Sequence, residues 1–145
     1  RTQFSMWAIM AAPLIAGNDL RRMTPEVREI LLNGELIAVD QDPLGIQGRV
    51  VIERGNGYSV WMKPLVDGSK AVAFLNMRSD STDLYVRWQE IGLQPGEAMV
   101  RDLWQHRDLG VHRDDGTHFG TRLKVRVPPH GTAVYRITQP VREAR

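Results

Sequence analysis

The chain has 145 residues, of which 42% are hydrophobic and 25% are charged; its formal net charge is +2 and it has no cysteine. This composition is typical of a globular protein, and the lack of cysteine excludes disulfides and thiolate zinc sites. No apolar stretch approaches the ~20 residues of a membrane span, and no Lys/Arg block exceeds two residues. We therefore expect neither a membrane-spanning segment nor nucleic-acid binding.

The first residues have the spacing of an amphipathic helix. Four apolar residues recur at intervals of three and four, namely Phe4, Trp7, Ala8 and Ala11. Pro13 is expected to end this helix, because proline disfavours the helical conformation of the residue before it. The apolar run 14–16 predicts a very short buried strand, and Gly17 permits a turn after it.

A second helix is predicted to begin at residues 24–26. Thr24 suits the N-cap, Pro25 the first helical position, and Glu26 the positive end of the helix dipole. An apolar stripe follows at Val27, Ile30 and Leu31. Asn33-Gly34 ends this helix and begins another short one over 35–39. A helix, a short buried strand and a helix are typical of an α/β unit.

After residue 45 the hydrophobic period changes to two, which predicts β-strands. The expected strands are 49–54, 58–63, 71–77, 84–89, 97–103, 122–127 and 132–138. Turn residues separate them at 55–57, 94–96 and 128–131. Short strands at this spacing favour an antiparallel sandwich or barrel. We therefore divide the chain into a helical region, 1–45, and an antiparallel β-sandwich domain, 46–145.

Asp19 is a candidate site residue because it follows the short run 14–16, and barrel enzymes keep their chemistry at the carboxyl ends of strands. The alternative is a loop acid that accepts hydrogen bonds from nearby backbone amides. A glycosidase would need a second carboxylate within reach, and Glu26 and Glu29 belong to a helix face. The acidic segment 40–45 lacks the ligand spacing of a calcium loop, so we interpret it as a turn between domains.

The histidines His106, His112, His118 and His130 match no known metal-ligand spacing, and we interpret them as surface-loop residues that form no metal site. Aromatic side chains on β-sandwiches can stack on sugar rings. Trp88 falls on the apolar face of its predicted strand and is expected in the core. Trp61 and Tyr85 fall on the opposite faces, so they are candidates for carbohydrate binding, with packing as the alternative.

Several separated motifs carry a resemblance to a known family. They are Phe4-Ser5-x-Trp7-Ala8, then Ala12-Pro13-Leu14, Asp19-Leu20, and Ile37 to Gly48, with Asp40 where the family usually has Asn. Further matches follow at 100–104, 108–110 and 127–131. Together these segments resemble the α-galactosidases (melibiases) of glycoside hydrolase family 27, at the end of the catalytic (β/α)8 barrel and in the C-terminal antiparallel domain.

The resemblance implies an α+β fragment, with the last βα unit of the barrel followed by a Greek-key β-sandwich that braces it. It implies a retaining glycosidase that hydrolyses terminal α-linked galactose without a cofactor, in a secreted or periplasmic setting. The family's two catalytic aspartates lie in Lys-Tyr-Asp and Trp-Arg-x-x-x-Asp motifs, and neither motif occurs here. The resemblance therefore places no catalytic residue in this chain, which alone should be inactive, and leaves Asp19 without a catalytic role.

A free-standing carbohydrate-binding or structural β-sandwich is the alternative function. In either case the apolar side chains of residues 1–45 need a surface to cover them, which is the sandwich, the rest of a barrel, or another copy of the chain. We expect residues 48–138 to be the robust unit and residues 1–45 to be a labile arm.

Overall fold

The computed structural model describes residues 1–117, 120 and 122–141. In chain order the helical elements are α1 (Thr2–Ile9), η1 (Leu20–Arg22), α2 (Pro25–Leu31), α3 (Gly34–Asp40) and η2 (Trp88–Ile91). The strands are β1 (Arg49–Arg54), β2 (Tyr58–Pro64), β3 (Lys70–Asn76), β4 (Thr82–Val86), β5 (Gly96–Asp102), β6 (Arg107–Asp114), β7 (Leu123–Val127) and β8 (Thr132–Thr138).

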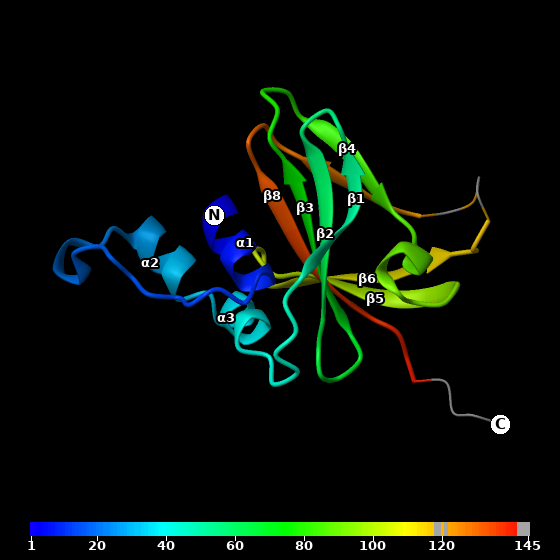
Figure 1. The fold of residues 1–145 in the computed structure, drawn as a ribbon, viewed down its shortest axis with the longest axis horizontal. Helices are drawn as coiled ribbons and strands as arrows, with labels where there is room; N and C mark the ends of the chain where they lie inside the picture. The colour runs from blue at the N-terminus through cyan, green and yellow to red at the C-terminus, as the bar shows by residue number, and fades with distance from the viewer. Residues whose placement is uncertain (118–119, 121, 142–145) are drawn as a thin grey trace.

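The described strands form two antiparallel sheets. The larger sheet has the order β1-β2-β3-β8-β5-β6, and the smaller one pairs β4 with β7. Alternate side chains of both sheets meet in a core that includes Phe74, Val100, Leu84 and Val125, and Trp88 of η2 is fully buried in it. Figure 1 shows this arrangement as two layers, with the helical region beside the larger sheet. The prediction of an antiparallel β-sandwich is confirmed.

A second core lies on the other face of the larger sheet. Phe4, Ala8 and Ile9 of α1 and Leu36 and Val39 of α3 pack there. The sheet contributes Leu65, Ala71, Ala73, Leu103, Trp104 and Val134. As a result residues 71–74 of β3 are fully buried on both faces, as their continuous apolar run predicts.

Two helix starts follow the predicted capping chemistry. The Thr24 side chain accepts a hydrogen bond from the Val27 amide, with Pro25 at the first helical position. The Asn33 side-chain oxygen accepts from the amides of Glu35 and Leu36 at 3.1 Å each. Asn33 also donates through Nδ2 to the carbonyl of Leu103, so this cap ties α3 to the turn after β5.

The end of α1 and the run 14–16 correct the sequence-based prediction. The helix ends at Ile9, and Ala11 has a φ of 51°, so it leaves the predicted apolar face. Residues 14–16, all described, form no strand, and Ile15 is 79% exposed. A strand needs a neighbour for its backbone groups, and in the described structure no other strand pairs with this segment.

Two further corrections concern the sandwich. Trp88 is fully buried as expected, but it starts the 3-10 helix η2, and strand β4 ends at Val86. Strand β6 was missed, so His112 lies on a strand and not in a loop. β6 is the edge strand beside β5, and a strand that is mostly exposed has no need of alternating apolar residues.

The connection from α3 to β1 passes very close to the end of α1. The amide of Gly48 donates to the carbonyl of Ile9 at 2.8 Å. A Cβ placed on Gly48 would lie 2.6 Å from that carbonyl oxygen and 2.5 Å from Cγ2 of Ile9. Glycine is therefore required at this point of contact.

Candidate functional site

The helical region contains an open, largely apolar groove. Its volume is about 420 Å³. The larger apolar side chains along it are Phe4, Trp7, Leu14, Ile15, Val27, Leu31 and Ile37. Gln3, Asn18 and Gln41 supply polar groups, and α1, α2 and α3 supply most of its walls. The residues that line the groove include no ionised side chain.

Asp19 lies outside the groove's lining and is engaged locally. Its Oδ1 accepts hydrogen bonds from the Arg21 amide at 3.0 Å and from Arg21 Nε at 3.1 Å. These bonds hold the pKa of Asp19 below its ordinary value. The geometry is that of an N-cap for η1, which is the structural alternative considered from the sequence. Whether Asp19 also contacts a substrate stays a prediction.

The two aromatic candidates lie in different surroundings. Trp61 is half-buried against the second core, and its Nε1 donates to the Ser59 hydroxyl at 3.0 Å, which fits packing, the alternative considered from the sequence. Tyr85 is 38% exposed, and the Arg122 guanidinium lies 5.2 Å from its ring centroid. One face of the tyrosine ring is thus already occupied by a cation. The structure does not bring these two residues together with Asp19 in one pocket.

The histidines do not gather. Among the residues that the structure describes, no group of three or more His, Asp or Glu side chains is placed to hold a metal ion. His118 lies outside the described residues. His106 and His130 lie in turns and both have a left-handed φ, of 53° and 49°. No helix in the described part of the chain is long and apolar enough to cross a membrane.

Residues 41–44 form a turn, within the predicted turn segment 40–45, and Asp40 is the last residue of α3. Asp42 accepts hydrogen bonds through Oδ1 from the amides of Leu44 and Val66, each at 3.0 Å, and so ties this turn to the β2–β3 connection. The neighbouring Asp40 ends α3, and its backbone oxygen accepts from the buried Lys63 ammonium at 3.3 Å. Within the described residues the Oδ1 atom of Asp40 is buried without a hydrogen-bond partner. Burial raises the pKa of Asp40 despite the attraction of Lys63.

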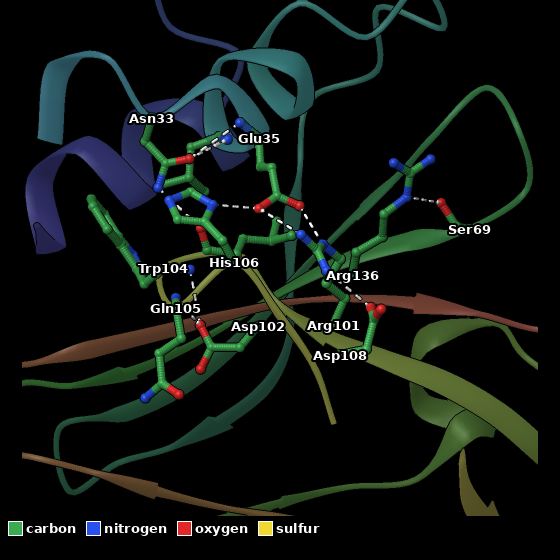
Figure 2. A network of polar contacts seen from close by, with 12 residues as sticks. Asn33, Glu35, Ser69, Arg101, Asp102, Trp104, Gln105, His106, Asp108 and Arg136 are labelled. Carbon is green, nitrogen blue, oxygen red and sulfur yellow. Dashed lines mark hydrogen bonds and ion pairs between the residues drawn. The ribbon is translucent and has the colours of Figure 1, made fainter. Parts of the chain in front are cut away.

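A polar network joins α3 to the turn after β5 (Figure 2). Glu35 binds Arg101 Nε through Oε1 and lies against Nδ1 of His106 through Oε2, both at 2.5 Å. Arg101 also donates to Asp108 of β6 at 3.1 Å. Three elements thus share one chain of charged groups, at the place where the helical region meets the sandwich.

Sequence analysis did not single out Glu35, Arg101 or Lys63. Glu35 and Arg101 are 66 positions apart, and only the antiparallel path of the sheet brings them together. The one local signal was the Asn33-Gly34 helix start, which places an acid in the first turn of α3. Glu35 also lines a cleft of about 330 Å³ together with Asp42 and Arg136. The described contacts of Glu35, Arg101 and Lys63 join α3 to the strands of the larger sheet.

Comparison with known proteins gives a consistent result over both regions. Residues 55–137 match the family model described as alpha galactosidase C-terminal beta sandwich domain, and residues 1–42 match the one described as alpha galactosidase A. Alpha-galactosidase 3 of Arabidopsis thaliana is 46% identical over 110 residues, which are 74% of this chain and 25% of the relative. An alpha-galactosidase of Oryza sativa is 37% identical over 95% of this chain and 31% of the relative.

A solved structure shows the same fold. Alpha-galactosidase I from Mortierella vinacea superposes with a TM-score of 0.81 at 27% identity, covering 92% of this chain and 34% of that one. The chain thus spans about a quarter to a third of the length of the relatives that it matches.

Proposed function

This chain belongs to the α-galactosidases of glycoside hydrolase family 27, and from that membership we propose that it is the C-terminal portion of a retaining α-galactosidase. The enzyme would remove terminal α-linked galactose from oligosaccharides or glycoconjugates. The observation that carries this proposal is the order of the two matches, a barrel segment at 1–42 followed by the sandwich at 55–137. A free-standing sandwich would have no reason to carry the first segment.

The catalytic aspartates are proposed to lie outside this chain. A retaining mechanism needs two carboxyl groups about 5 Å apart, one as nucleophile and the other as acid and base. The motifs that carry them in the family are absent from this sequence. Asp19 is held by Arg21 at the start of η1 and makes no such pair with its described neighbours. Its role, like those of Trp61 and Tyr85, stays a prediction.

The apolar groove supports a contact with the rest of the barrel. Its walls come from residues 1–45, which we propose to be the end of the barrel domain, with residues 46–145 as the sandwich domain. Ile15 lines the groove and is 79% exposed, and Leu20 and Leu32 of the same segment are each at least 60% exposed. Exposed apolar side chains around a groove are typical of a surface that another part of the protein covers. The upstream barrel is the occupant that the family match supplies.

The test uses the gene and a chromogenic substrate. Reading the gene upstream of Arg1 should reveal the Lys-Tyr-Asp and Trp-Arg-x-x-x-Asp motifs, and the full-length protein should hydrolyse p-nitrophenyl α-galactoside. The 145-residue chain alone should show no turnover above buffer. Turnover by the chain alone that is lost in Asp19→Asn would place the chemistry here and overturn the proposal, as would an upstream sequence that lacks both motifs.

A further inference from the structure

The turn between β5 and β6, residues 103–106, makes hydrogen bonds to both α1 and the start of α3. Leu103 accepts from Asn33 Nδ2 at 3.0 Å, and Trp104 Nε1 donates to Ser5 Oγ of α1 at 2.9 Å. Asp102 shapes the turn by accepting from the amides of Trp104 and Gln105. The turn is therefore held rigidly against the starts of α1 and α3.

His106 is the last residue of this turn and has a φ of 53°, in the left-handed region. Glycine adopts this region most readily, and histidine is one of the few other residues enriched there. The histidine side chain has one contact that a glycine lacks, which is the 2.5 Å contact of its Nδ1 with Glu35. An ionised carboxylate only accepts hydrogen bonds, so Nδ1 carries the proton. Histidine at this position therefore combines a tolerated left-handed backbone with a side-chain contact to α3.

We propose that Glu35 is the centre of an ionic latch, formed with Arg101 and His106, through which the sandwich fixes the first turn of α3. Oε1 of Glu35 accepts from Arg101 Nε of the strand, and Oε2 lies against His106 of the turn and also accepts from Arg101 Nη2 at 3.4 Å. A rotation or a slide of α3 would therefore break at least one of these contacts. By the proposed function α3 is the last helix of the barrel. The latch would then make Glu35 a positioning residue for the barrel's closing segment, and only this consequence rests on the proposed function.

The electrostatic environment of Glu35 predicts that the latch loses its stabilising effect at low pH. Partial burial acts to raise the pKa of Glu35, but the hydrogen bonds and charges of Arg101 and His106 outweigh it and hold that pKa below 4.5. A depressed folded pKa contributes stability above the unfolded value, and this contribution is lost as the pH falls through the folded pKa. The other charged groups on this side are Asp108, paired with Arg101, and Asp42 and Arg136, which line the cleft beside Glu35.

The sandwich supplies a matched control in Asp83. This carboxylate also has two cationic partners, Lys124 and Arg126, and its side chain is 28% exposed against 29% for Glu35. Its partners, however, connect β4 with β7 and do not touch the helical region. Asp83→Asn therefore removes a comparable ion-pair cluster without touching α3.

Amide hydrogen exchange of the 145-residue chain tests the latch locally. At pH 7, Glu35→Gln should speed the exchange of residues 35–40 by about threefold to tenfold, since a part-exposed charged hydrogen bond is worth about 1 kcal/mol. Asp83→Asn should leave those residues unchanged. The difference between Glu35→Gln and the original chain should shrink as the pH falls below 4.5.

A second variant separates the contact from the backbone strain. His106→Asn keeps a side chain that tolerates the left-handed turn but removes the imidazole. It should speed exchange in α3, and the double variant with Glu35→Gln should be less than additive, because both changes remove the same bond. Unchanged exchange in Glu35→Gln, equal acceleration by Asp83→Asn, or full additivity would each overturn the latch. None of these outcomes bears on galactosidase activity.

Discussion

The helical region behaves as two different parts. α1 and α3 bury Phe4, Ala8, Ile9, Leu36 and Val39 against the sheet, each at most 5% exposed. The segment between them, residues 11–32, has no buried residue and projects away from the sheet, as Figure 1 shows for α2. Both parts belong to the same proposed barrel piece. The difference teaches that the fold of this piece depends on what covers each element: α1 and α3 have fully buried residues, whereas the segment between them has only partly buried ones, among them Leu14, Ile30 and Leu31.

Limited proteolysis tests this difference between the two parts most directly. We expect cleavage first within residues 11–32, because opening an exposed segment costs almost no free energy, whereas opening buried elements approaches the ~5–15 kcal/mol of global unfolding. Mass spectrometry of the early fragments locates the cuts. The sequence alone predicts a labile arm over residues 1–45, cut first between residues 17 and 33 or near Gly45. The burial of α1 and α3 now predicts that they stay with the sandwich until it unfolds.

The second largest expected difference between the two parts is in how much a substitution changes the free energy of unfolding. Leu36→Ala empties a fully buried position in the second core and should lower the free energy of unfolding by about 2–5 kcal/mol. Ile15→Ala removes a side chain that is 79% exposed and should change it by less than about 0.5 kcal/mol. Urea denaturation measures both. Equal losses would mean that segment 11–32 packs in solution and that the contrast is false.

The smallest effect concerns Asp40 at the end of α3. Its pKa is raised by burial, so its stabilising contribution is present at low pH and is lost as the pH rises through the folded pKa. Asp40→Asn stays neutral and should be more stable than the original chain at pH 7, by less than about 1 kcal/mol. The advantage should vanish in acid, where Asp40 is protonated. A destabilised variant at pH 7 would show that the attraction to Lys63 dominates.

Residue patterns predicted the features that depend on local chemistry. The alternation in β2 and β7, the caps at Thr24 and Asn33, and the buried run of β3 all agree with the structure. Each depends on neighbours in sequence or on burial of a whole face. The antiparallel architecture followed from their spacing.

What the sequence did not show depends on contacts between distant residues. Strand β6 has little burial and so little pattern, and Trp61 is covered by helices that precede it in the chain. The latch at Glu35 needs Arg101 and His106, which reach it only once β5 and its turn are in place. The run 14–16 has the apolar pattern of a buried strand. It forms no strand because the described chain provides no neighbouring strand to pair with it.

The close contact at Gly48 has a practical meaning for building hybrid enzymes. The closest contact at the joint between the two regions is not in the turn that follows α3 but at the point where Gly48 lies on the last turn of α1. A crossover placed upstream of residue 48 would combine one parent's glycine and strand with the other parent's α1. Any side chain larger than hydrogen there would displace that helix. Exchanging sandwiches between relatives should therefore move α1, α3 and Gly48 as one cassette.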